Sequence, residues 1–184
     1  MTRFALILVA AFALGQSFAP ALHAQDRARL DDLFTALREA PAGGWEAIEE
    51  QIWDQWSHSG SPAMDLLLQR GRDALAAEDI EAAIEHLTAL VDMAPDFAEG
   101  WNMRATAYYK AGLVGPALAD IGRVLTLEPR HFGALTGLGL ILEESGDLAG
   151  AVGAYGAALA IHPHRADLRE AIERLEEELQ GEPI

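Results

Sequence analysis

The fold is decided by residues 98–131, which read AEGWNMRATAYYKAGLVGPALADIGRVLTLEPRH. The same pattern of large, small and proline positions recurs at one constant interval before and after this stretch, between Met64 and Pro163. A period of about 34 residues with fixed large and small positions is typical of a stacked array of helix–turn–helix units. The matched columns are Pro95, Pro129 and Pro163; Leu67, Trp101 and Leu135; Gly71, Ala105 and Gly139; Ala83, Ala117 and Ala151; Leu87, Ile121 and Tyr155; and Ile84, Leu118 and Val152.

Each repeat is predicted to form two helices, and the repeats cover residues 64–97, 98–131 and 132–163. Small residues in the glycine and alanine columns allow the two helices to approach closely, and the large columns fill the remaining space. The proline near the end of each repeat removes a backbone donor and stops the second helix. Asp79 and Asp147 stand where a side-chain oxygen would cap a second helix.

Several of these residues carry a family resemblance. They are Trp101, Ala105, Tyr108, Ala117 and Pro129 in the middle repeat, and Gly139, Ala151, Tyr155 and Pro163 in the third. Through them the stretch 64–163 resembles the tetratricopeptide repeat. The resemblance implies an all-α fold, a right-handed α-solenoid of three helix–turn–helix repeats whose first helices line a concave groove. It also implies a non-enzymatic scaffold that binds a protein or an extended peptide there.

The resemblance places candidate binding residues on the first helix of each repeat. Asn102 and Tyr109, together with several carboxylates, favour an extended and partly basic peptide. A clamp for a terminal carboxylate is not favoured, because Met103, Gly133 and Gly137 stand where further clamp groups would be needed. The candidate groove residues are Asp65, Leu68, Arg72, Glu99, Asn102, Thr106, Tyr109, Lys110, Thr136, Leu140, Glu143 and Glu144. No oligomeric state follows from the sequence.

Helices are also predicted on both sides of the repeats. Residues 25–62 are expected to form an N-terminal helical hairpin and a linker, and residues 164–184 a C-terminal capping helix and tail. The second helix of the hairpin carries Trp45, Trp53 and Trp56 on one side. We expect this face to dock on the first repeat and close that end of the array. The alternatives are an exposed aromatic patch that grips a partner, or self-assembly through this helix.

The first 24 residues have the features of a cleavable secretory signal. A basic start precedes an apolar run from Phe4 to Leu14, and small residues follow it. Cleavage is expected after Ala24 or after Ala21, and it would place the mature chain in a bacterial periplasm or, alternatively, in the medium. An apolar run of this length is too short to span a bilayer, so no stable membrane insertion of the mature chain is expected.

Charge and composition exclude some functions. The chain has 13 Lys and Arg against 29 Asp and Glu, which gives a net charge of −16. Such a surface repels nucleic-acid phosphates, so we expect no nucleic-acid binding. The chain has no cysteine, which excludes disulfide and thiol chemistry.

No catalytic motif is present, and we expect neither a cofactor nor a metal ion. The sequence has no Gly-x-Ser-x-Gly elbow, no His-Glu-x-x-His and no phosphate-binding loop. The one alternative in the class of enzymes is a metal-dependent hydrolase that uses His162 and His164, with Asp167 as a possible third ligand. Six glycines in the third repeat predict a locally soft unit unless tight packing offsets their cost.

Overall fold

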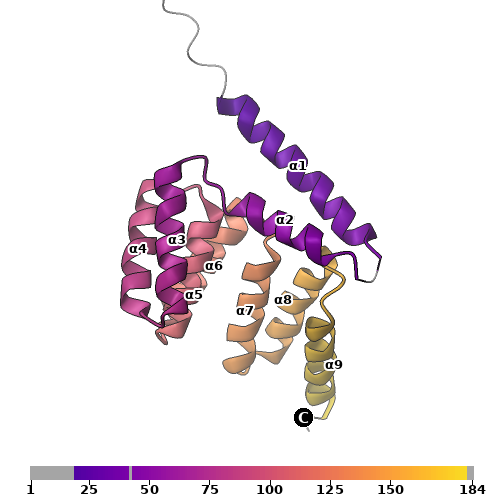
Figure 1. The fold of residues 1–184 in the computed structure, drawn as a ribbon. Coiled ribbons are helices and arrows are strands. Elements are labelled where there is room, and N and C mark those ends of the chain that lie inside the picture. The colour runs from indigo at the N-terminus through magenta and orange to yellow at the C-terminus, as the bar shows by residue number, and fades with distance from the viewer. Residues whose placement is uncertain (1–18, 42, 182–184) are drawn as a thin grey trace, which may run out of the picture.

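The computed structural model describes residues 19–41 and 43–181, and within them it contains nine α-helices and no β-strand. The chain is an all-α helical repeat solenoid, as the periodicity predicts (Figure 1). The helices are α1 (Ala19–Glu39), α2 (Glu46–Trp56), α3 (Pro62–Ala76), α4 (Ile80–Met93), α5 (Ala98–Lys110), α6 (Val114–Leu127), α7 (Phe132–Glu144), α8 (Leu148–Ile161) and α9 (Ala166–Gly181).

The glycine column brings the two helices of a repeat together. Gly71 of α3 lies directly against the side chain of Leu87 of α4, and Gly139 of α7 lies against the ring of Tyr155 of α8. A methyl group added at either glycine would overlap the neighbouring side chain. The alternation of large and small residues deduced from the sequence is confirmed at these pairs.

The turn inside each repeat places one residue in the left-handed backbone region. These residues are Glu78, Gly112 and Gly146, with φ angles of 59°, 74° and 84°. They occupy equivalent positions in the three repeats, so Glu78 adopts in the first repeat a conformation that glycine supplies in the other two. Asp79 and Asp147 follow directly, and their carboxylates accept the capping hydrogen bonds of α4 and α8, as predicted.

The hairpin α1–α2 does not cap the first repeat, so this prediction is wrong. Figure 1 shows α2 lying across the ends of α7 and α8, with α1 beyond it. The rings of Trp53 and Trp56 lie 5.3 and 5.1 Å from that of Phe132, the first residue of α7. At the other end of α2, Trp45 lies 5.1 Å from His162, which follows α8. We call this contact the hairpin seam; it packs the tryptophan face within the chain.

The open face of the first repeat explains why α2 does not dock there. Ala107 of α5 packs on the first repeat. The equivalent residue of α7, Ile141, packs in the same way on the second repeat. The equivalent residue of α3, one repeat before Ala107, is the exposed Asp73. Its carboxylate accepts a hydrogen bond from Gln69, so the face is polar at this position, although it also carries the exposed Leu66.

The last helix closes the other end of the array. Leu168 and Leu175 of α9 are buried in one apolar core with Tyr155 of the third repeat and Phe34 of α1. The third repeat, the C-terminal helix and the N-terminal hairpin therefore share a core. In the part of the chain that the structure describes, no helix is long and apolar enough to cross a membrane. Most of the predicted signal, residues 1–24, lies outside the described residues.

Candidate binding groove

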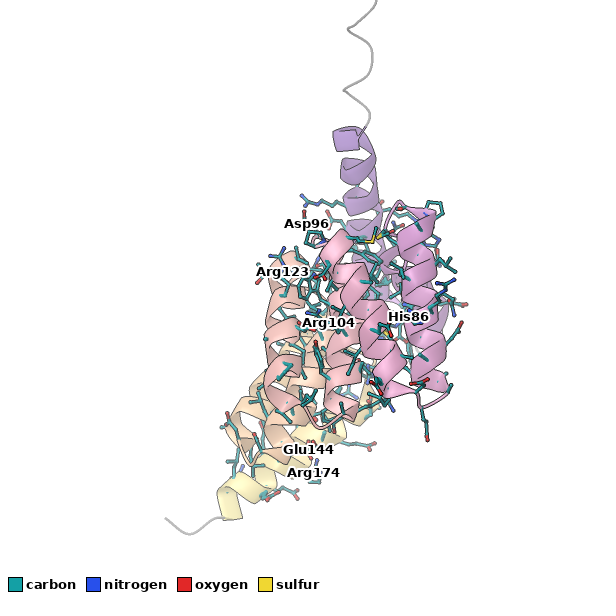
Figure 2. All side chains as sticks on the ribbon, turned by 90° about the vertical axis from the view of Figure 1, so that its left-hand side faces the viewer. His86, Asp96, Arg104, Arg123, Glu144 and Arg174 are labelled. Atoms are coloured by element: carbon teal, nitrogen blue, oxygen red, sulfur yellow. The ribbon has the colours of Figure 1, made fainter. Side chains whose placement is uncertain are left out.

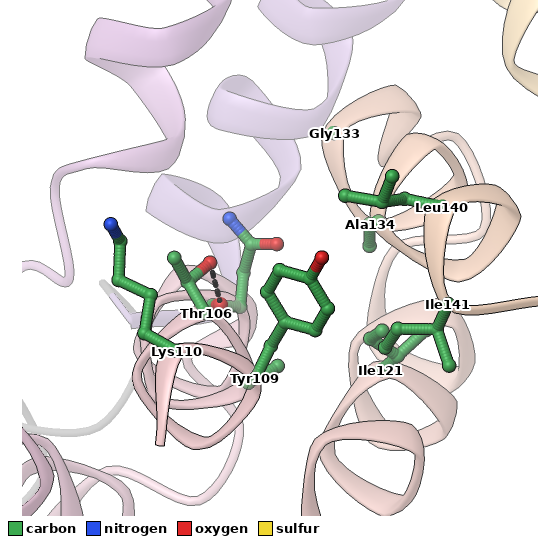
Figure 3. A pocket seen from close by; sticks show the side chains of 11 residues that line it. Thr106, Tyr109, Lys110, Ile121, Gly133, Ala134, Leu140 and Ile141 are labelled. Atoms are coloured by element: carbon green, nitrogen blue, oxygen red, sulfur yellow. Dashed lines mark hydrogen bonds between the residues drawn. The ribbon is translucent and has the colours of Figure 1, made fainter. Parts of the chain in front are cut away.

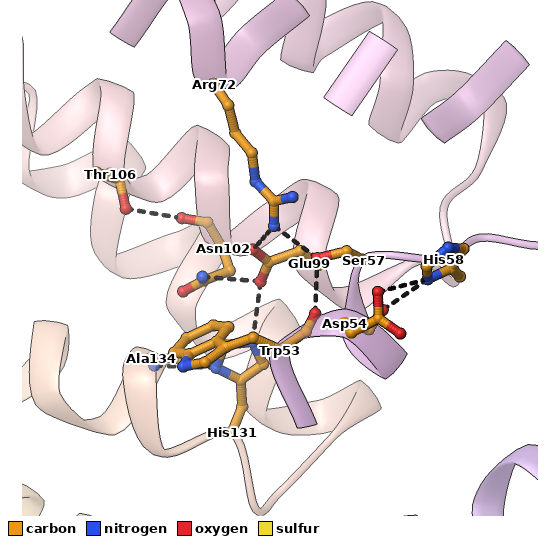
Figure 4. Close-up of polar contacts among 10 residues, drawn as sticks. All are labelled: Trp53, Asp54, Ser57, His58, Arg72, Glu99, Asn102, Thr106, His131 and Ala134. Carbon is orange, nitrogen blue, oxygen red and sulfur yellow. Dashed lines mark hydrogen bonds and ion pairs between the residues drawn. The ribbon is translucent and has the colours of Figure 1, made fainter. Parts of the chain in front are cut away.

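The predicted groove residues belong to two different environments. Three of them, Arg72, Glu99 and Asn102, form a polar cluster around the buried Glu99 carboxylate (Figure 4). Arg72 of α3 donates to Glu99 Oε1 at 2.7 Å, and Asn102 donates to Glu99 Oε2 at 3.0 Å. Arg72 also donates to the hydroxyl of Ser57, the residue after α2, at 2.9 Å. We call these residues, with His131, the Glu99 cluster.

His131 joins this cluster to the third repeat. Its Nδ1 accepts a hydrogen bond from the backbone N–H of Ala134 and thereby caps α7. A nitrogen that accepts carries no proton, so Nε2 carries it and donates to Glu99 Oε2 at 3.2 Å. The imidazole stacks on the indole of Trp56 with ring centroids 4.1 Å apart. The cluster thus connects α3, α5 and α7 to the end of α2.

Burial removes several predicted residues from the groove surface. Glu99 is only 2% exposed and Leu68 only 1%, so both belong to the interior, in contrast to the prediction. The guanidinium of Arg72 forms an ion pair with the carboxylate of Glu99. The carboxylate of Asp65 accepts from the backbone and the hydroxyl of Ser59, and so shapes the linker before α3.

The second environment is a pocket between α5 and α7, with a floor from α6 (Figure 3). Its volume is about 260 Å³. It is lined by Asn102, Ala105, Thr106, Tyr109, Lys110, Ile121, Gly133, Ala134, Gly137, Leu140 and Ile141. Apolar side chains and glycines make up most of this lining, and the polar groups all come from α5. We call it the α5–α7 pocket.

Polar groups along α5 give the pocket its hydrogen-bonding capacity. Asn102 uses its amide nitrogen on Glu99, and no described residue uses its side-chain oxygen. Tyr109 donates to Glu144 Oε1 of α7 at 2.6 Å, and this hydrogen bond raises the pKa of the phenol. Lys110 is exposed and forms no ion pair within the described residues.

The remaining predicted residues on α7 differ in their contacts. Leu140 lines the pocket and is 39% exposed. Thr136 donates its hydroxyl to the carbonyl of Phe132, one turn earlier in α7. Glu143 accepts from Tyr155 and forms an ion pair with Arg174 of α9, so its carboxylate is occupied.

Sequence reasoning missed the apolar half of the lining. Ile121 comes from a second helix, and Ala134 and Ile141 are positions that also pack on the preceding repeat. Gly137 was the available signal, because it leaves space on α7 where a side chain would otherwise stand, whereas Trp53 fills the space beside Gly133.

Two arginines on another face of the second repeat are engaged in ion pairs. Arg104 donates to both carboxylate oxygens of Asp120, at 2.7 and 2.9 Å. Arg123 forms a longer pair with Asp96, at 3.2 Å. Figure 2 shows Arg104, Arg123 and Asp96 on the side of the molecule where α4 lies. These cations stabilise the repeat and do not form a basic patch.

The histidines proposed as metal ligands have other contacts. His164 donates Nε2 to the carbonyl of Leu37 in α1 at 2.8 Å, and Asp167 accepts two hydrogen bonds from Arg165. His162 is fully buried among aromatic rings. In residues 19–41 and 43–181, no group of three or more His, Asp or Glu side chains is arranged to hold a metal ion.

Comparison with known proteins shows the family. The tetratricopeptide-repeat family model matches residues 68–118 and 103–166. A TPR repeat-containing protein of Rhizobium etli is 37% identical over 154 residues, which cover 83% of this chain and 76% of that protein. The chain therefore belongs to the tetratricopeptide-repeat family.

Solved structures share its fold at low sequence identity. A crystal structure of MamA has a TM-score of 0.60 at 16% identity, covering 92% of this chain and 87% of that one. The first TPR of Spaghetti (RPAP3), bound to the HSP90 peptide SRMEEVD, has a TM-score of 0.61 at 19% identity. That match covers 64% of this chain and 94% of the other. At these identities the similarity concerns the fold.

Proposed function

We propose that the chain is a non-enzymatic interaction module that binds an extended segment of a partner protein along α5 and α7. The observation that carries this proposal is the α5–α7 pocket, which is apolar inside and has hydrogen-bonding groups along one side. The tetratricopeptide-repeat structure solved with an HSP90 peptide supports the same class of ligand.

The size of the pocket favours a side chain over a complete small-molecule ligand. Pockets for drug-sized ligands usually have volumes of roughly 300–1,000 Å³. This pocket has about 260 Å³. An apolar cavity of roughly 150 Å³ already accepts a benzene-sized group. We therefore propose that one aromatic or branched aliphatic side chain of the partner enters it, while the oxygen of Asn102 accepts from the partner's backbone.

Charge has a smaller part in this proposal than the sequence suggested. The expectation of a basic peptide rests on groove carboxylates, but Glu99, Glu143 and Glu144 each bind another side chain. Shape and apolar contact in the pocket are therefore the features on which recognition is proposed to depend. Export to the periplasm is also a proposal, and it rests on the signal features of residues 1–24.

A photo-crosslinking experiment tests the pocket. A benzophenone side chain at Thr106, which lines the pocket, should capture a partner segment in the native compartment, whereas one at Gly153 on α8 should not. A labelled peptide with the captured sequence should then bind the purified protein. Capture that is equal at both positions would contradict the proposed site.

Filling the pocket provides the matched test of affinity. Gly137 has room for a Cβ, whose nearest neighbour would be Ile121 at 3.8 Å, so Gly137→Leu should fold and occupy the cavity. We expect it to weaken peptide binding by roughly tenfold or more, because the partner's side chain loses its apolar site. The control Gly153→Leu changes the same residue type on the exposed side of α8, where no neighbour stands in the way. Equal affinity of the two variants would contradict the proposal.

A further inference from the structure

Three of the six histidines lie in the hairpin seam, and each contacts a tryptophan of α2 or of the turn before it. His131 stacks on Trp56, and Trp45 lies against both His162 and His164. Histidine is the side chain whose ordinary pKa lies close to physiological pH. The surface that holds the hairpin is therefore built around imidazole side chains.

The surroundings of His162 make a gain of charge on its ring costly. Its side chain is 0% accessible, and neither ring nitrogen has a hydrogen-bond partner in the described residues. The rings of Trp45 and Phe132 lie against it, each with a centroid distance of 5.1 Å. A proton added here would create a charge in an apolar site, which is costly unless it is paired.

The charged groups around His162 do not remove this cost. From α2, Glu49 Oε1 lies 3.7 Å from His162 Nε2, beyond hydrogen-bonding distance. From the segment before α9, Arg165 and His164 oppose a positive charge on the ring. Burial outweighs the attraction of Glu49, and the pKa of His162 is lowered from its ordinary value of 6.5.

The direction of the pH effect follows from linkage. When the hairpin leaves, water reaches His162 and its pKa returns towards 6.5, so the open state binds more protons than the docked state. The equilibrium constant for docking of the hairpin is therefore highest above pH 6.5 and falls as the pH drops below this value. For each pH unit by which docking lowers the pKa of His162, this constant falls by up to roughly tenfold in acid.

The hairpin is the element whose release exposes His162. Helix α8, which precedes His162, is packed between α7 and α9. The hairpin has one covalent connection to the array, the linker 57–61, in which Gly60 has a φ of 82°. Its other attachments are side-chain contacts, chiefly the core that it shares with the third repeat and α9. Local opening of these contacts restores water to the histidine without unfolding the repeats.

We propose that the α1–α2 hairpin is a histidine-lined latch that opens on mild acidification and uncovers the start of α7. The surface uncovered includes Phe132 and Gly133, and Gly133 is covered by Trp53 in the docked state. Because Gly133 also lines the α5–α7 pocket, the open state has a longer apolar groove than the docked state. The latch does not depend on the identity of any partner.

Amide hydrogen exchange of the full chain tests the latch. Exchange in α2 and in α4 is measured at about pH 7.5 and about pH 5.5, and corrected for the intrinsic pH dependence. We expect protection of α2 to fall by roughly tenfold or more in acid while protection of α4 stays unchanged. Equal loss in both helices, or no loss in α2, would overturn the proposal.

Two variants and a control assign the effect to His162. His162→Leu keeps an apolar filling and removes the titrating group, so its α2 helix should stay protected at the lower pH. Glu49→Gln removes the one attractive charge that faces His162, so it should enlarge the loss of protection. His86→Leu, on α4 and outside the hairpin seam, should behave as the wild type. The same loss of protection in His162→Leu as in the wild type, or no enlargement in Glu49→Gln, would overturn the proposal.

Discussion

The Glu99 cluster and the α5–α7 pocket lie next to each other along α5 and α7, yet they are opposite in character. In the Glu99 cluster beside the seam, every polar side chain is bound by another part of the chain, and Glu99 is 2% exposed. In the pocket, Lys110 and the side-chain oxygen of Asn102 have no partner among the described residues. Asn102 belongs to both regions, and Gly133 contacts both.

A position on the first helix of a repeat does not by itself make a residue available for binding. Arg72 and Lys110 are both cations on the first helix of a repeat. The guanidinium of Arg72 is bound by Ser57 and Glu99, whereas the ammonium of Lys110 is exposed and available to a ligand. The α1–α2 hairpin covers part of the surface formed by the first helices, and the α5–α7 pocket is the part that stays uncovered. Three substitutions test this contrast.

The largest effect is expected from Arg72→Met. It leaves the carboxylate of Glu99 buried with only Asn102 and His131 to bind it. Loss of one partner of a fully buried pair costs roughly 3–5 kcal/mol; because the side chain of Arg72 is 30% exposed, we expect unfolding in urea to show about 2–3 kcal/mol less stability. The double variant with Glu99→Gln should recover most of this loss, because no buried charge remains. A single variant as stable as the wild type would contradict the role given to the Glu99 cluster.

An intermediate effect is expected from Gly133→Ala. The new methyl group would overlap the indole of Trp53, and overpacking of this kind costs about 1–3 kcal/mol. Gly153→Ala has open space at its Cβ and should instead stabilise the protein by about 0.5–1 kcal/mol through better helix propensity. Thermal unfolding of both variants would show this opposite sign. Equal shifts in the same direction would mean that α2 does not press on Gly133.

The smallest effect is expected from Tyr109→Phe at the mouth of the pocket. The hydrogen bond from Tyr109 to Glu144 is exposed to solvent, so its loss should cost only about 0.5 kcal/mol. With Tyr109 in place, the substitution Glu144→Gln should lower the pKa of the tyrosine, because that hydrogen bond is the main reason why it is raised. An absorbance titration would detect this shift, and an unchanged titration would show that the two groups do not meet.

Much of the fold could be predicted from local features of the sequence. The constant spacing of the repeats, the aspartate caps and the pairing of Gly71 with Leu87 depend on neighbours within one repeat. The position of the hairpin depends on contacts between residues far apart, such as Trp56 with His131. No spacing rule connects these residues. That Asp73 lies on the open face of the first repeat is evident only once the structure shows which side of α3 is exposed.

The candidate site was predictable in part, for a related reason. Family resemblance gave the α5 residues Asn102, Thr106, Tyr109 and Lys110, because first helices line a groove in such arrays. Family resemblance could not show that Glu99 is buried. The position of Glu99 in the repeat does not reveal that Arg72 and His131 bind its carboxylate.

The hairpin packs on the third repeat and leaves the pocket between α5 and α7 open. The nuclear Overhauser effect in the intact protein at neutral pH measures this most directly. We predict cross-peaks between the ring protons of Trp56 and His131, and between the indole of Trp53 and the α protons of Gly133. Cross-peaks from these tryptophans to Leu66, on the open face of the first repeat, would contradict the claim.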